Sequence, residues 1–185
     1  MHPRSSNLLA SLALAAAAWS LSPGIAVSQT APAAVAHPIP QSLRLEHEDT
    51  AERLGRLAKR PGQVGVEARK ALELYRRHAA REEEYIMPPL TLLPLLADGK
   101  VTPDMAWAVA MSDRVRADRE VIFQEHTQVT DVLNRLVVAA IRAHDKDATD
   151  FAQAAATDSL NDLEVMEPTV LLIGDYLRAK LPAAH

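Results

Sequence analysis

The chain has 185 residues, of which 48% are hydrophobic and 4% aromatic, with a formal net charge of -4 and no cysteine. This length suits one domain with a buried core, and the many alanine and leucine residues favour helices over strands. A slightly acidic chain without a long Lys/Arg block is not expected to bind nucleic acid. The lack of cysteine excludes disulfides and thiolate metal ligands, so any metal must be held by histidine and carboxylate.

The first 40 residues have the pattern of an export signal followed by a linker. A short apolar run after a weakly basic start is ended by a Pro-Gly pair, and small residues follow up to Ser28. We therefore expect a signal peptide over residues 1–28, cleaved after Ser28, and an Ala/Pro-rich linker over residues 29–40. The mature protein is then expected in the periplasm or outside the cell, with no membrane attachment once the signal is removed.

Four long segments with helical periodicity follow, and they make residues 41–181 the folded domain. The expected helices cover residues 42–59, 63–86 and 102–143, and a fourth runs from a cap at Asp145 or Asp147 to about residue 180. Pro168 interrupts the fourth helix. It is expected to kink that helix, because its ring removes a backbone donor and crowds the preceding turn.

The two halves of this domain repeat each other at an offset of 79–80 residues. The pair Glu46-His47 in the first expected helix matches Glu125-His126 in the third. Between the second and fourth helices, the matching residues are His78 with Asp158, Glu82 with Asp162, and Pro88 with Pro168. A helical hairpin followed by its own copy predicts an all-α, antiparallel four-helix bundle.

Histidines and acids fall on the helix faces that are expected to point into this bundle, because core-facing positions recur at spacings of three and four. The residues concerned are His47, His78, Glu82, His126, Asp158 and Asp162. On the fourth helix, the complete set of expected inward positions is Phe151, Ala155, Asp158, Asp162, Val165, Thr169, Leu172 and Tyr176. Buried carboxylates without partners are costly, and one or two metal ions held by the six side chains would offset that cost. Mixed imidazole and carboxylate ligands suit iron, manganese or zinc.

Other interpretations of these residues remain open. The three histidines can be core residues hydrogen-bonded to nearby acids. Asp158 or Asp162 can accept a hydrogen bond from a ligand histidine instead of binding the metal directly. The sequence has no glycine-rich phosphate loop and no nucleophile-elbow motif, and no residue is assigned a catalytic role.

The ordered set of candidate ligands resembles the hemerythrin-like, or HHE cation-binding, family over about residues 41–180. The residues that carry the resemblance are His47 on the first helix, His78 and Glu82 on the second, His126 on the third, and Asp158 and Asp162 on the fourth. The chain departs from the family on the fourth helix, where a histidine followed four residues later by glutamate is usual. The family includes oxygen carriers, sensors and proteins linked to nitric oxide response or iron-sulfur repair.

The resemblance implies a non-haem metal-binding protein with iron as the cofactor, as two ions, with manganese or zinc as alternatives, and the N-terminal signal pattern adds the expectation of export. Such a protein would bind or react with a small ligand such as oxygen or nitric oxide, in sensing, scavenging or metal handling. The aspartates on the fourth helix motivate an alternative, a degenerate bundle without metal that acts as a structural or partner-binding module. A metal-dependent oxidase or peroxidase is a third hypothesis, and no particular protein partner is indicated.

Overall fold

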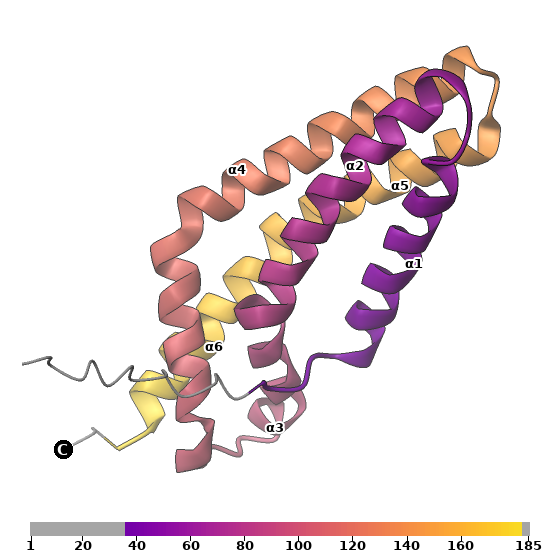
Figure 1. Ribbon diagram of the computed structural model, residues 1–185. Coiled ribbons are helices and arrows are strands. Elements are labelled where there is room, and N and C mark those ends of the chain that lie inside the picture. Colours follow the sequence, from indigo (N-terminus) through magenta and orange to yellow (C-terminus); the bar gives the residue numbers. More distant parts are fainter. Residues whose placement is uncertain (1–35, 183–185) are drawn as a thin grey trace, which may run out of the picture. The chain divides into compact units, whose positions relative to one another are not determined.

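The computed structural model describes residues 36–182, and every regular element in that range is a helix (Figure 1). In chain order the elements are α1 (Gln41–Leu57), α2 (Gly62–Arg81), the π-helical turn η1 (Glu82–Ile86), the 3-10 turn η2 (Pro88–Leu92), α3 (Leu93–Ala97), the 3-10 turn η3 (Pro103–Met105), α4 (Ala106–Arg142), α5 (Lys146–Asn161), the π-helical turn η4 (Asp162–Met166) and α6 (Glu167–Lys180). The expected signal peptide and most of the linker lie outside the described residues. Within those residues, no helix combines the length and apolarity needed to cross a membrane.

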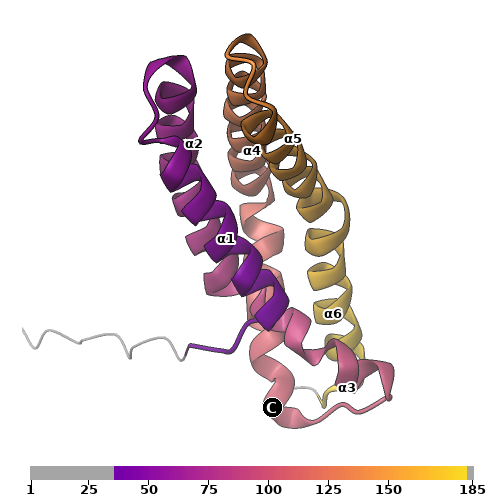
Figure 2. The same ribbon diagram turned by 90° about the vertical axis from the view of Figure 1, so that its right-hand side faces the viewer.

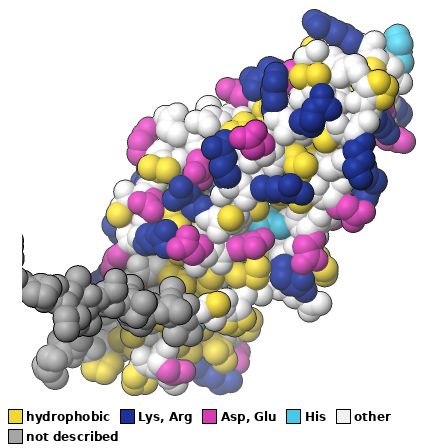
Figure 3. Space-filling view, viewed as in Figure 1, with side chains coloured by type: hydrophobic (Ala, Val, Ile, Leu, Met, Phe, Trp, Pro, Cys, Tyr) yellow, Lys and Arg dark blue, Asp and Glu magenta, His cyan; other side chains and the backbone are white. Residues whose placement is uncertain are grey.

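The helices pack lengthwise against one another. The longest, α4, packs along α2 and along α5 and α6, while α1 packs against α2. Figure 2 shows α1 beside α2, and α4 beside α5. On the face seen in Figure 3, acidic and basic side chains are interspersed. The all-helical class predicted from the sequence is therefore confirmed for residues 36–182.

The helix boundaries agree with the sequence-based expectation at most positions. One of the two expected caps is used: the Asp145 carboxylate accepts a hydrogen bond of 3.1 Å from the Ala148 amide, which satisfies a free donor at the start of α5. The third expected helix begins with the 3-10 turn η3 before it becomes α4.

Two wide π-helical turns precede two prolines. The Met87 amide, immediately before Pro88, donates to the Glu82 carbonyl five residues back, at 2.7 Å. The Glu167 amide, immediately before Pro168, donates to the Asp162 carbonyl in the same way. Proline has no amide hydrogen and crowds the turn before it, so a widened turn accommodates both features without ending the helical path. The structure therefore accommodates Pro168 with the π turn η4.

The π turn also corrects the inward positions predicted for the fourth helix. Val165, Leu172 and Tyr176 are exposed, with 62%, 68% and 39% of their surface accessible. The buried positions in this segment are instead Met166, Val170, Ile173 and Leu177. A π turn contains one residue more than an α turn, so every later residue is rotated to a neighbouring face. The inward positions predicted after Asp162 by α-helical spacing were therefore wrong.

The interior contains two apolar clusters with a polar layer between them. One cluster includes Leu54, Ala71 and Val129, and the other includes Tyr85 and Ile122. Five of the eight buried polar residues in the described part of the chain lie between members of the two clusters: His47 on α1, His78 and Glu82 on α2 and η1, His126 on α4, and Ser159 on α5. The fold thus brings polar residues from four helical segments into one buried layer.

Helices α4 and α6 approach each other closely at Gly174. A Cβ atom at this position would lie 2.1 Å from the Ser112 hydroxyl oxygen and 2.3 Å from the Ser112 Cβ. Gly55 on α1 differs, because a Cβ there would meet no atom within 4 Å. Of these two glycines, only Gly174 is required by packing.

We predict opposite effects for the same substitution at these two glycines. Gly174→Ala should lower the free energy of unfolding by about 1–3 kcal/mol, because the added methyl group overlaps Ser112. Gly55→Ala should raise it by about 0.5–1 kcal/mol, because alanine loses less conformational entropy in a helix. Urea unfolding of both variants measures the difference, and equal changes would contradict the close contact between α4 and α6.

Candidate metal centre

Glu82 lies at the centre of the polar layer. It is the first residue of the π turn η1 and has no accessible surface. Neither of its carboxylate oxygens has a hydrogen-bond partner. A buried carboxylate without hydrogen bonds is strongly unfavourable unless a cation compensates its charge.

Three histidines from three helices direct the same ring nitrogen at this carboxylate. The Nε2 atoms of His78 and His126 lie 3.2 and 3.6 Å from Glu82 Oε1. The Nε2 atom of His47 lies 3.1 Å from the other oxygen, Oε2. All three imidazoles are buried, with at most 7% of each residue exposed. The four side chains thus gather their nitrogen and oxygen lone pairs around one point without hydrogen-bonding to each other.

The other ring nitrogen of two of these histidines has a hydrogen-bond partner. His47 Nδ1 is 2.9 Å from Glu83 Oε1, and His126 Nδ1 is 3.1 Å from the Ser159 hydroxyl. His78 Nδ1 is 3.9 Å from Glu125 Oε2, too long for a hydrogen bond. Two hydrogen bonds from Arg81, of 2.8 and 2.9 Å, hold the Glu125 carboxylate in place. Partners on the far nitrogen fix the tautomer and ring orientation of metal-binding histidines, so this pattern suits ligation through Nε2.

The electrostatics keep Glu82 and His126 in the form that binds metal, whereas at His47 the effect of burial is outweighed by the carboxylates of Glu82 and Glu83, which raise the pKa of that imidazole. Burial favours the neutral form of Glu82, but the surrounding imidazoles of His47, His78 and His126 outweigh it and hold the pKa of Glu82 well below its usual value. Burial, followed by the nearby His78, lowers the pKa of His126 to about 4. At neutral pH the centre therefore contains an ionised carboxylate and a neutral His126 with a free lone pair, as metal binding requires.

The group that best fits a single ion consists of His78, Glu82 and His126. One ligand atom from each lies within 4.8 Å of the others, and all three residues are buried. Beyond its approach to Glu82, the His126 Nε2 atom has no hydrogen-bond partner. The donor set and its unpartnered atoms fit a divalent metal ion, so this buried cluster can hold one.

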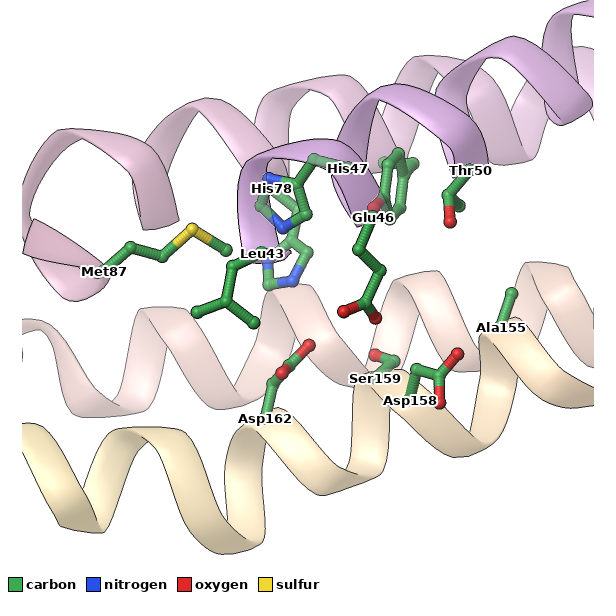
Figure 4. A pocket seen from close by; sticks show the side chains of 11 residues that line it. Leu43, Glu46, His47, Thr50, His78, Met87, Ala155, Asp158, Ser159 and Asp162 are labelled. Carbon is green, nitrogen blue, oxygen red and sulfur yellow. The ribbon is translucent and has the colours of Figure 1, made fainter. Parts of the chain in front are cut away.

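Asp158 and Asp162 lie close to this cluster but outside it. They line a cavity of about 20 Å³ together with Glu46, His47 and His78 (Figure 4). Asp158 is exposed, in contrast to the buried position expected from the helical spacing, and Asp162 is partly buried. Burial and then the charge of Glu82 raise the pKa of Asp162 to about 7. The structure thus brings four of the six candidate ligands into direct contact and places the two aspartates at the rim.

Two residues that orient the histidines were not expected from the sequence: Glu83 and Ser159. Glu83 lies beside the ligand Glu82 in the sequence, and helical periodicity assigns such neighbours to other faces. Ser159 follows Asp158, and a buried serine carries no sequence signal for this role. Only the partnering of each ring nitrogen in three dimensions identifies them.

No protein-family model, no curated protein and no solved structure matches this chain. The assignment of the centre therefore rests on the geometry of its own side chains.

We predict that His126 makes the metal-free protein sensitive to acid. The pKa of this imidazole is about 4 in the folded chain, against an ordinary value of 6.5. The unfolded chain therefore binds more protons between these values, so stability is present above pH 6.5 and is lost as the pH falls towards 4. The loss from this residue should be on the order of 3 kcal/mol.

Urea unfolding in the presence of a chelator, at pH 7.5 and pH 4.5, measures this effect. His126→Asn should reduce the difference between the two pH values, whereas His144→Asn, at an exposed position, should leave it unchanged. An unaltered pH dependence in His126→Asn would show that this imidazole is not held neutral by the fold.

Proposed function

We propose that this chain is an exported, hemerythrin-like, non-haem metalloprotein that binds iron at the buried cluster and interacts with a small ligand such as oxygen or nitric oxide. The observation that carries the proposal is the convergence of three Nε2 atoms on one carboxylate that has no hydrogen bonds.

The ligand types are compatible with iron. His78, His126 and one oxygen of Glu82 supply two imidazoles and one carboxylate, a combination that protein iron(II) sites use with further positions left open. An iron ion held in this way supplies a redox-active centre to which a small molecule can bind. Manganese and zinc accept the same ligand types and are the alternatives.

The cavity beside the metal-binding imidazoles has room for a small ligand. Its volume of about 20 Å³ is close to that needed for one water molecule. The cavity is lined by His47 and His78, so a diatomic molecule within it would lie beside the metal-binding imidazoles. This is compatible with ligand binding in sensing, scavenging or metal handling.

The arrangement of the helices supports the hemerythrin-like assignment. Helices α1, α2 and α4, with α5 and α6 as one interrupted fourth helix, correspond to the four helices of an antiparallel bundle. The π turns begin at Glu82 and Asp162, and each is followed by a proline. The two turns are separated by the offset of about 80 residues that also separates the matching residues in the sequence. A shared irregularity of the backbone at this offset supports a duplicated hairpin. Export rests on the signal-like pattern of residues 1–28 alone.

We predict that His78→Ala removes most of the bound metal. Wild-type protein, purified without affinity-tag metals and loaded anaerobically with ferrous iron, should contain at least one iron per chain by elemental mass spectrometry. At a hundredfold excess of metal over its dissociation constant, binding should stabilise the wild-type fold by about 2.7 kcal/mol, and His78→Ala should lose this gain.

His144→Asn is the matched control, because His144 is exposed and lies outside the centre. Wild-type protein that contains no metal after ferrous loading, and melts at the same temperature with and without chelator, would contradict the metalloprotein proposal. That result would support the alternative, a metal-free bundle that serves as a structural or partner-binding module.

A further inference from the structure

A groove with a largely apolar lining runs between α1, the η2–α3 segment and the segment from α5 to α6. Its volume is about 380 Å³. The apolar residues that line it are Leu43, Leu90, Leu93, Val165 and Met166. Sites for small organic molecules have a similar size and lining, together with a few polar groups that fix the ligand.

Two of the apolar lining residues are open to solvent. Leu93 and Val165 have 42% and 62% of their surface accessible. Val165 belongs to the π turn η4, which also contains Asp162. This turn takes Val165 out of the core and brings it to the groove together with an acidic residue. π turns often occur at functional sites, so the irregular backbone supports a role for the groove in binding.

Where the groove adjoins the small cavity, it carries three carboxylates. Glu46 extends from α1, while Asp158 and Asp162 extend from the opposite side into the same space (Figure 4). Among residues 36–182, these three side chains form no ion pair and no hydrogen bond, whereas the neighbouring Glu48 pairs with Arg44. None of the described residues that line the groove is a lysine, arginine or histidine. Like charges without a basic partner favour a cation.

A fully buried carboxylate adds negative charge behind these three acids. Glu82 has no accessible surface, and neither of its oxygens has a hydrogen-bond partner. Its Oε2 atom lies 3.1 Å from His47 Nε2, and His47 lines the cavity that adjoins the groove. Burial and then the charge of Glu82 raise the pKa of Asp162 to about 7, so this charge acts on the groove.

The three carboxylates suit an organic cation and not a bare metal ion. A metal ion needs ligand atoms that converge on one point. Among the described residues, only the ligand atoms of His78, Glu82 and His126 come within 4.8 Å of one another. An ammonium group instead donates up to three hydrogen bonds in different directions, so its acceptors can lie further apart. An apolar chain attached to it would continue along the apolar part of the groove.

We infer that the groove binds a primary organic ammonium ion with an apolar tail. The ammonium group lies among Glu46, Asp158 and Asp162, and the tail lies along Leu93 and Val165. The inference goes beyond the proposed function, because this ligand occupies the groove and needs no ion at the buried metal centre.

Isothermal titration calorimetry of the full chain tests this inference. Protein as purified, and protein freed of metal with a chelator and then dialysed, are titrated with three probes. Octylammonium has both the charge and the tail, octanol has the tail alone, and methylammonium has the charge alone. Octylammonium should bind at one site per chain and at least ~10-fold more tightly than either of the other probes, because only octylammonium matches both parts of the groove.

Two variants of the carboxylates separate the charge from the tail. Glu46→Gln should bind octylammonium at least ~10-fold more weakly and should leave octanol binding unchanged. Asp158→Asn should behave in the same way, and its exposed side chain makes the change tolerable if Glu46→Gln is unstable by circular dichroism. Glu48→Gln, at an exposed position on the same helix, is the matched control and should bind all probes as wild type does.

A variant of the apolar part gives the complementary test. Val165→Asn should weaken the binding of octylammonium and of octanol alike, by about 3–10-fold, because both tails lose the same apolar contact. Val138→Asn is its matched control, since Val138 is 47% exposed and does not line the groove.

The outcomes separate this inference from the proposed function, because the metal-free titration does not depend on the metal centre. Octanol that binds as tightly as octylammonium would overturn the role of the carboxylates. Octylammonium that binds Glu46→Gln and Asp158→Asn as tightly as wild type would place the ligand elsewhere and overturn the inference. Wild type that does not bind octylammonium would also overturn it, and binding of a lysine-containing amphipathic peptide in that case would assign the groove to a protein partner.

Discussion

The structure depends on one fully buried carboxylate, that of Glu82. Removing a charged group from water is costly, and the fold offsets this cost with three imidazoles instead of hydrogen bonds to the backbone. Each imidazole comes from a different helix, so the position of Glu82 links α1, α2 and α4. The same constraint explains why the interior has two apolar clusters, since the polar layer around Glu82 separates them.

The backbone irregularities of the protein lie beside this layer. The π turns η1 and η4 start at Glu82 and Asp162, and the backbone carbonyls of these residues accept the five-residue hydrogen bonds that the following prolines require. A proline two residues beyond each wide turn fixes its location, because no regular α-helical hydrogen bond is available there. π turns often occur at functional sites, and here both begin at candidate metal-binding or rim residues.

Much of the fold and part of the centre follow from helical periodicity alone. Regular spacing is sufficient to identify His47, His78, Glu82 and His126 as inward-facing, because each lies on an unbroken α-helical segment or at its end. Spacing wrongly predicts that Val165 and Leu172 are buried, because the π turn rotates the residues after it to another face of the helix. A proline allows such a turn but does not require it, so the sequence alone does not reveal it. Spacing also misses Glu83 and Ser159, because their hydrogen bonds to His47 and His126 depend on how neighbouring helices pack, which no single-helix pattern contains.

The polar layer between the two apolar clusters also affects how the protein unfolds. Each cluster is held together by dispersion and hydrophobic contacts among its own members, and the layer between them contributes neither. We therefore expect the two clusters to unfold as separate cooperative units, although they share the same continuous helices. An ion bound at Glu82 would couple these units. Occupancy of the centre would then determine whether the helices unfold from one end or in a single cooperative transition.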